Sequence, residues 1–289
     1  MHSETTQVAI AGGGPAGLML SHLLAQSGID NIVVEARDHD TIYNTHRAGI
    51  LEAGVVKMLT DSGVDGRVAT HGDEHAGIDL RFNGASHPLD FLDLVDATVT
   101  LYSQTEVFWD LAAARRRDGG DIRFECTVTE VSDVHTSRPK LRYTDAGGAA
   151  HEIVAGILVG ADGSHSLCRK AVPGESYFQE YPFAWFGILT QAPKSAPELV
   201  YANSPHGFAL ISQRSETVQR MYFQCDPNED AAAWSEDRIW TELQKRVAGG
   251  DGFELKTGPI FDQSVLAFRS YVHEPLSHGR LYLAGDAGH

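Results

Sequence analysis

The sequence has little cysteine, little positive charge and no long apolar run, and each shortage excludes a class of protein. Cys126, Cys168 and Cys225 are widely spaced and form no C-x-x-C pair, so a disulfide framework or a zinc site is not expected. Lys and Arg number 23 against 39 Asp and Glu, a formal net charge of −16, which argues against nucleic acid or an anionic membrane as partner. With neither a bilayer-spanning stretch nor a visible secretory leader, we expect a soluble, cytoplasmic protein without a metal site.

The composition that remains is that of an ordinary globular protein, with 42% apolar and 21% charged residues in 289 residues. That length supplies one or two domains with a sizeable core. The pattern of Gln7–Ala11 predicts a β-strand, that of Leu18–Gln26 a helix, and that of Asn31–Glu35 a second strand. This order predicts a parallel sheet with a right-handed crossover.

The middle of the chain has a different pattern, typical of an antiparallel sheet. Short alternating segments with Gly- and Asp-rich turns recur at 78–82, 98–102, 122–127, 140–143, 183–190, 207–214 and 220–224. Helical patterns at 106–116 and 234–247 lie between them, and 157–160 returns to a buried strand. We predict an α/β protein, in which a Rossmann-like nucleotide-binding domain is interrupted by an inserted, mostly antiparallel β-sheet domain.

The clearest motif is Gly12-x-Gly14-x-x-Gly17, which follows the first strand and opens the first helix. Gly12 permits a tight turn, Gly14 lets a pyrophosphate approach the backbone, and Gly17 lets the helix pack on the strand. Free N–H groups at the start of the helix would face the phosphates. Glu35 ends the next strand, where an acid can bind ribose hydroxyls. The motif predicts a dinucleotide site but does not decide between FAD and NAD.

Two further turns follow strands, at Gly160-Ala161-Asp162-Gly163 and at Gly285-Asp286. Either turn alone would be unremarkable. Together with the first motif they place three separate strand ends around one nucleotide, which fits FAD threaded through a single domain. We therefore add Asp162 and Asp286 to the predicted cofactor-binding residues.

The two strands expected at 207–214 and 220–224 form a hairpin with a candidate anion receptor. Ser212 and Arg214 share one face of the first strand, and Arg220 and Tyr222 share one face of the second. If these faces coincide, the guanidinium of Arg214 and the hydroxyls of Ser212 and Tyr222 converge. Such a group of donors can bind a carboxylate through several hydrogen bonds. Alternation alone would still favour a solvated polar face.

Together, these motifs resemble the flavin-dependent aromatic hydroxylases over essentially all 289 residues. The stretches that carry the resemblance are HRAGILE (46–52), LYSQTEV (101–107), GADGSHS (160–166), YPFAWFGIL (181–189), YANSPHGFALISQRS (201–215), AFRSYVHEP (267–275) and GRLYLAGDAGH (279–289). The flavin motifs are common to the class, whereas 201–215 resembles the members that act on 4-hydroxybenzoate. The resemblance implies FAD as cofactor, NADPH or NADH as co-substrate, O2 and a small aromatic acid as substrates, and 3,4-dihydroxybenzoate as product.

The resemblance also implies roles that the patterns leave open. Arg214, with Ser212 and Tyr222, would hold the substrate carboxylate. Tyr201 would hydrogen-bond the phenol, and His75 would be the solvent end of a proton relay, since histidine titrates near neutrality. Tyr201 and Arg214 would anchor opposite ends of the ring, which favours a para relation between phenol and acid.

Five further positions match residues that contact nucleotides in the family. Arg47 and Gln104 match flavin contacts, and Arg220 matches a residue beside the flavin ring, where positive charge favours the reduced anion. His165 and Arg269 match positions linked to the nicotinamide nucleotide, for which the sequence has no second GxGxxG.

One departure from the family concerns the choice of coenzyme. Thr41 and Thr45 stand where the NADPH-preferring members carry a tyrosine and an arginine. Fewer cations there would weaken the grip on a 2′-phosphate, although Arg37 and His39 could compensate. The choice between NADH and NADPH therefore stays open.

The resemblance implies a division into two domains. Residues 1–72, 97–180 and 268–289 would form a discontinuous FAD-binding domain, and 73–96 with 181–267 a substrate-binding sheet. The helical C-terminal part of the family has no counterpart in this sequence, so we expect a truncated chain, and a homodimer is a further expectation. Two alternatives stay open: a hydroxylase of another carboxylated phenol, and an inactive fragment that binds FAD or an aromatic acid.

Overall fold

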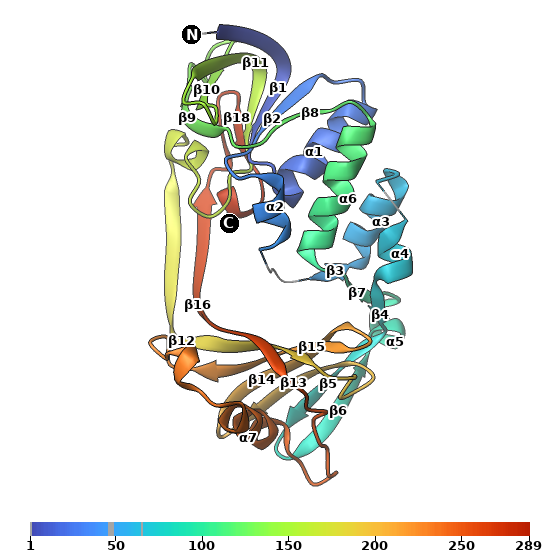
Figure 1. Ribbon diagram of the computed structural model, residues 1–289. Coiled ribbons are helices and arrows are strands. Elements are labelled where there is room, and N and C mark those ends of the chain that lie inside the picture. Colours follow the sequence, from blue (N-terminus) through green and yellow to red (C-terminus); the bar gives the residue numbers. More distant parts are fainter. Residues whose placement is uncertain (1, 46–48, 65) are drawn as a thin grey trace.

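A computed structural model describes residues 2–45, 49–64 and 66–289 (Figure 1). An α/β body carries both ends of the described chain, and a second sheet with a helix on its outer face lies below it in the view. Two long strands connect the two parts. Among the described residues, no helix has the length and apolarity needed to span a membrane.

The sheet of the upper body has the strand order β17-β18-β11-β1-β2-β8, and β10 and β9 are attached beyond β11. Its strands are β1 (His2–Ala11), β2 (Asn31–Val34), β8 (Asp121–Arg123), β9 (Thr127–Ser132), β10 (Lys140–Thr144), β11 (Ala150–Gly160), β17 (Ser277–His278) and β18 (Leu281–Leu283). β1 pairs in parallel with both β2 and β11. The predicted parallel pairing of the first two strands is confirmed.

Helices cover both sheets and lie between them. They are α1 (Pro15–Gln26), α2 (His39–Tyr43), α3 (Ala53–Asp61), α4 (Arg67–His71), α5 (Phe91–Val95), α6 (Gln104–Arg117) and α7 (Glu236–Val247), with short 3₁₀ turns η1 (Cys168–Ala171), η2 (Ala231–Ala233) and η3 (Gly285–Ala287). α1 and α6 pack on the sheet of the upper body through Leu18 and Phe108, which bury against Ile10 and Val33. Ser103 caps α6 by accepting from the Glu106 amide at 3.2 Å, so the position where this helix begins is fixed by its own sequence.

The lower sheet has the order β16-β12-β15-β14-β13-β5-β6. Its strands are β5 (Gly77–Phe82), β6 (Ala85–Asp90), β12 (Glu175–Gln191), β13 (Leu199–Ser204), β14 (Gly207–Ser215), β15 (Val218–Cys225) and β16 (Ile260–Glu274). All its pairs are antiparallel except β13 with β5. α7 covers one face through Ile239 and Leu243, which pack against Phe186 and Phe223. The predicted α/β fold with a mostly antiparallel inserted sheet is confirmed.

Two features between the sheets were not anticipated. β3 (Ile50–Glu52), β7 (Val99–Leu101) and β4 (Asp73–His75) form a small third sheet, so the predicted strand at 98–102 belongs to neither large sheet. β12 and β16 pair from Glu175–Glu274 to Thr190–Ile260, with a register shift between Glu180 and Ala184. Figure 1 shows this β12–β16 ribbon running from the upper body into the lower sheet.

Candidate active site

A cavity of about 700 Å³ opens at the carboxyl ends of the parallel strands of the upper sheet. The turns that follow β1, β2, β11 and β18 meet there because parallel strands end at the same edge. Six residues predicted to bind the cofactor line it: Gly12, Gly14, Glu35, Gln104, Asp162 and Asp286. Arg47, also predicted, lies outside the described residues.

The three motif glycines serve different purposes. Gly12 has φ +102°, and a Cβ on it would collide with the Ala161 carbonyl, so the turn itself requires glycine. A Cβ on Gly17 would collide with the Gly12 carbonyl, which explains the close packing of α1 on β1. Gly14 differs, because no protein atom lies within 4 Å of where its Cβ would stand. The space beside Gly14 is cavity, and a backbone that must be approached closely by a phosphate fits this arrangement.

Glu35 is fixed at the mouth of this turn. Its Oε2 accepts from the Gly13 amide at 2.8 Å, and its Oε1 accepts from the Arg37 amide at 2.9 Å and from Arg37 Nε at 3.2 Å. A carboxylate oxygen has two lone pairs, so Arg37 uses both of those on Oε1, and Oε2 keeps one. The side chain can therefore hold the glycine turn and still accept a hydroxyl from a ribose.

Asp162 supports the cavity wall more than it faces the cavity. Its Oδ2 accepts from the amides of Leu167 at 2.7 Å and Cys168 at 3.1 Å, and its Oδ1 accepts from the Ser166 hydroxyl at 2.5 Å. These bonds fix the loop between β11 and η1 at the edge of the cavity. Among the described residues, the Asp286 carboxylate has no such partner and lines the cavity directly.

His165 and Arg269 meet at one edge of the same cavity. Arg269 Nη2 lies 3.2 Å from Ser164 Oγ and 3.5 Å from His165 Nε2, and His165 and Ser164 are lining residues. Both predicted residues are exposed or nearly so. They come from the β11–η1 loop and from β16, two segments that only the fold brings together.

The β14–β15 hairpin forms as predicted and brings its polar face together. Ser212 is paired with Arg220, and Leu210 with Tyr222, so Ser212, Arg220 and Tyr222 lie on one face, while Arg214 falls in a register shift between Gln213 and Ser215. Burial first, and then the charge of Arg220, lowers the pKa of Arg214. Burial raises the pKa of Tyr222. The Ser212 hydroxyl already donates to the Arg220 carbonyl at 2.8 Å.

Aromatic rings line the same face. Trp185 stacks on Phe208 with 5.4 Å between centroids, lies 5.0 Å from Tyr222 and meets Phe268 edge-on at 4.7 Å. Tyr201 lies 6.2 Å from Phe208, and burial raises the pKa of its hydroxyl. Trp185 and Phe268 were missed, although both lie in sequence stretches that carried the family resemblance.

His75 is buried rather than at the surface, with 2% of its area exposed. Its Nδ1 lies 2.6 Å from Glu198 Oε2, and its Nε2 lies 3.2 Å from Asp73 Oδ2. Lys194 Nζ lies 2.5 Å from the same Asp73 oxygen. The groups that meet solvent at this point are therefore the two carboxylates, not the imidazole.

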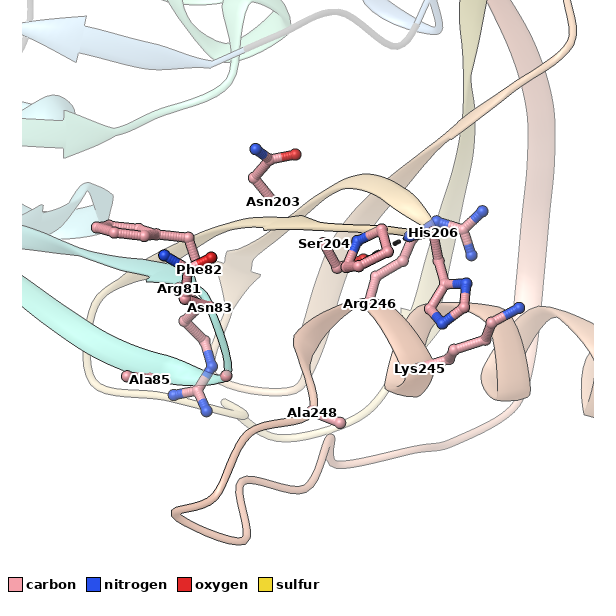
Figure 2. A pocket seen from close by; sticks show the side chains of 12 residues that line it. Arg81, Phe82, Asn83, Ala85, Asn203, Ser204, His206, Lys245, Arg246 and Ala248 are labelled. Carbon is pink, nitrogen blue, oxygen red and sulfur yellow. Dashed lines mark hydrogen bonds between the residues drawn. The ribbon is translucent and has the colours of Figure 1, made fainter.

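A second cavity, of about 800 Å³, lies on the lower sheet and holds none of the predicted residues. Figure 2 shows it between the β5–β6 hairpin, the β13–β14 turn and the end of α7. Its buried arginines already have partners: Arg81 with Asp79 and Asp251, and Arg246 with Glu242. With these charges balanced, the second cavity is a weaker candidate than the first.

Comparison with known proteins places these features in context. Residues 5–289 match a family model described as an FAD binding domain. The chain is 39% identical, over 293 residues, to p-hydroxybenzoate hydroxylase from Acinetobacter baylyi. This alignment covers 100% of this chain and 72% of that protein. The chain spans 54% of a probable NADH-specific resorcinol 4-hydroxylase from Rhodococcus jostii, at 24% identity over 99% of this chain.

Solved structures show the same fold. A p-nitrophenol 4-monooxygenase from Pseudomonas putida superimposes with a TM-score of 0.82 at 19% identity, and the match covers 100% of this chain and 74% of that one. At 19% identity this likeness concerns the fold alone, and because the match covers the whole chain it includes both the upper and the lower sheet.

Proposed function

Because this chain belongs to the FAD-binding family of flavin-dependent aromatic monooxygenases, we propose that its substrate is 4-hydroxybenzoate and its product 3,4-dihydroxybenzoate. FAD is the cofactor, and NAD(P)H and O2 are the co-substrates. The observation that carries the proposal is the β14–β15 hairpin, where the Arg214 guanidinium is held beside Arg220 and Tyr222 in a partly buried, aromatic-lined place.

The arginines favour an anionic substrate. Two guanidinium groups close enough to lower the pKa of Arg214 repel each other, and burial adds to the cost. A carboxylate between them would offset both effects, and a guanidinium can grip it with two parallel hydrogen bonds. We propose that Arg214 and Tyr222 bind the substrate carboxylate, and that Ser212 takes part only after releasing the Arg220 carbonyl.

The ring and the phenol would lie along β14. Tyr201 is paired with Leu210, and Arg214 stands four residues further along, about 13 Å of extended strand. With Phe208 and Trp185 beside them, side chains reaching inward from both ends would hold one flat ring with its polar groups in para positions. Since burial raises the pKa of Tyr201, its hydroxyl stays protonated at neutral pH and can donate to a substrate phenolate.

The cavity of the upper sheet fits FAD. Gly14 leaves open space where a phosphate would approach, and Glu35 and Asp286 offer acceptor oxygens to ribose and ribityl hydroxyls. We propose that Gly12, Gly14 and Gly17 with the start of α1 hold the pyrophosphate, and that Arg47, Gln104 and Asp286 contact the flavin half. Bound FAD would supply the redox chemistry, taking a hydride and activating O2 for transfer of one oxygen atom.

The remaining residues would arrange this chemistry. Arg220, whose guanidinium lies 5.0 Å from the Tyr222 ring centroid, would place positive charge beside the flavin. His165 and Arg269, which meet at the cavity edge, would bind the nicotinamide nucleotide, and Asp162 would hold the loop that carries His165. The aromatic wall would keep water from the reacting atoms.

The domain division is part of the proposal. We place the FAD-binding domain at 1–72, 97–180 and 268–289 and the substrate sheet at 73–96 and 181–267. The register shift of the β12–β16 ribbon between Glu180 and Ala184 supports a boundary there. A homodimer is proposed on the resemblance alone, and light scattering of the purified chain tests it.

The deciding experiment is oxidation of NADH and of NADPH by the FAD-loaded chain, with and without 4-hydroxybenzoate, with products separated by chromatography. We expect 4-hydroxybenzoate to accelerate oxidation and 3,4-dihydroxybenzoate to appear in matching amount. 3-Hydroxybenzoate serves as the comparison substrate. Faster turnover of 3-hydroxybenzoate, or oxidation that yields only H2O2, would overturn the substrate assignment. Ligand binding without flavin retention would identify an inactive fragment.

A further inference from the structure

The family resemblance implies that His75 belongs to a proton relay, and the contacts of the ring limit where a proton on it can go. The imidazole is 3% exposed as a side chain, whereas the Glu198 and Asp73 side chains beside it are 34% and 30% exposed. Because the ring barely meets water, a proton that reaches it leaves through a carboxylate. His75 would therefore be an intermediate proton carrier, and a carboxylate would be the last group of the relay before water.

The two carboxylates are not equivalent. Asp73 Oδ2 already accepts from Lys194 Nζ at 2.5 Å, so a proton arriving on that oxygen would break an ion pair. Among the described residues, Glu198 forms no ion pair with Lys or Arg, and its Oε2 makes the shorter contact with the ring, 2.6 Å against 3.2 Å for Asp73. Glu198 is the better placed acceptor.

The backbone ties Glu198 to the substrate pocket. Glu198 directly precedes β13, the strand that carries Tyr201 three residues later. His75 ends β4 and leads into β5, which pairs in parallel with β13 from Leu199–Ile78 onward. His75 and Glu198 thus stand just before two strands, β5 and β13, that are neighbours in the lower sheet, and β13 also carries Tyr201.

We propose that Glu198 is the terminal proton acceptor for the substrate phenol, acting through His75. This inference rests on the proposed function. The phenol O–H bond breaks as its proton enters the path beside Tyr201 and reaches Nε2 of the ring, where the longer Asp73 contact gives way. The Nδ1–H bond then breaks, an O–H bond forms on Glu198 Oε2, and the carboxylic acid passes the proton to water. The ring gains a proton at Nε2 and loses one from Nδ1, so the number of protons on it is unchanged, and nothing is oxidised or reduced.

The test measures how fast the bound 4-hydroxybenzoate loses its phenol proton, in the absence of hydroxylation. The FAD-loaded chain with bound 4-hydroxybenzoate is mixed rapidly into buffer of higher pH, and the ultraviolet absorbance of the bound phenolate is recorded. For Glu198→Gln, which keeps the shape of the side chain but accepts a proton poorly, we expect phenolate formation to slow about tenfold to hundredfold. The dissociation constant of 4-hydroxybenzoate should stay within about twofold, as for groups outside the pocket.

The matched control is Glu74→Gln, on the exposed side of the same β4 strand. It removes the same charge next to His75 in sequence without touching the ring, and we expect the wild-type rate. Raising the concentration of a small base, imidazole or formate, should restore the rate of Glu198→Gln, because an external acceptor replaces the carboxylate.

Two outcomes would overturn the inference. One is a Glu198→Gln rate equal to that of Glu74→Gln. The other is a slow rate that no added base restores and that comes with a lower melting temperature, which indicates a structural role. If the wild-type chain binds 4-hydroxybenzoate but never forms the phenolate, the proposed function fails as well, and that result is read on the wild type alone.

Discussion

Arg214 and Ser212 both come from β14, yet they differ in what they can offer a carboxylate. The Ser212 hydroxyl has a single hydrogen, and the Arg220 carbonyl already accepts it at 2.8 Å. The guanidinium of Arg214 has five donors and keeps its charge at neutral pH even with a lowered pKa. The alternation of the sequence placed both on one face but could not show which donor was already used.

Arg214→Gln should therefore weaken binding of 4-hydroxybenzoate by about tenfold to hundredfold, the usual value of hydrogen bonds to a charged group. Ser212→Ala should change it by less than about threefold. Titration followed by the flavin spectrum measures both. Binding of the neutral analogue 4-hydroxybenzamide serves as the control, and an equal loss for acid and amide would contradict the carboxylate role of Arg214.

Tyr201→Phe should remove the hydrogen bond to the phenolate while leaving the aromatic wall in place. Because burial raises the pKa of Tyr201, the wild-type hydroxyl is a donor over the whole neutral range. We expect the bound substrate to remain a neutral phenol near neutral pH and hydroxylation to fall by about hundredfold or more. Difference absorbance of the bound ligand checks the first point and product analysis the second; a phenolate spectrum in Tyr201→Phe would refute it.

At the scale of the element, the loop from Asp162 to η1 is held by one carboxylate. Asp162 accepts hydrogen bonds from two backbone amides and one hydroxyl. It therefore stabilises the loop before η1, in addition to any contact with the cofactor. Among the described residues, no such hydrogen bonds reach the Asp286 carboxylate, which lines the same cavity. The motif pattern predicted both as cofactor ligands, because sequence shows the turn but not where the carboxylate points.

Asp162→Ala should lower the free energy of unfolding by about 2 kcal/mol, with or without FAD, since charged hydrogen bonds to the loop are lost in both states. Asp286→Ala should leave the stability of the FAD-free chain unchanged and weaken FAD retention. Denaturant titration of both forms and flavin content after dialysis distinguish the two variants. If Asp162→Ala loses FAD without losing stability, the capping interpretation is wrong.

How much was predictable from sequence also differs by element. The hairpin face was predictable because side chains alternate with a fixed period and the turn joining β14 to β15 is short. Trp185 and Phe268 were not, since they reach the pocket from β12 and β16, far from the hairpin in sequence. Nothing in the sequence indicated a role for Glu198, because a single Glu before a strand is common and only the fold brings it to His75.

At the scale of the whole molecule, one ion pair ties the lower sheet to the chain beyond α7. Arg81, on β5, is 5% exposed, donates from Nε to the Val247 carbonyl at 2.9 Å and binds the Asp251 carboxylate. Hydrogen bonding to Arg81 lowers the pKa of Asp251. A lowered carboxyl pKa stabilises the fold above the unfolded-state value, and this stabilisation is lost as pH falls through the folded-state value.

Asp251→Asn should therefore reduce the stability near neutral pH and flatten its fall between about pH 5 and about pH 2. Thermal unfolding across that range, in wild type and variant, measures the difference. Asp237→Asn, an exposed change in the first turn of α7, is the control and should keep the wild-type slope. Identical slopes in Asp251→Asn and wild type would show that the Arg81 pair does not couple to proton binding.

The pairing of β18 with β11 has a consequence for synthesis of the chain. β1 pairs with β11, from His2–His151 onward, and β11 pairs with β18 at Leu158–Leu281. The upper sheet can therefore close only after the whole lower sheet has left the ribosome. Such distant pairings slow folding, and the edge of β11 that pairs with β18 stays unpaired until then, a state on which chaperones act. We expect the local hairpins β13–β14 and β14–β15 of the lower sheet to gain protection from hydrogen exchange before the β11–β18 pairing of the upper sheet.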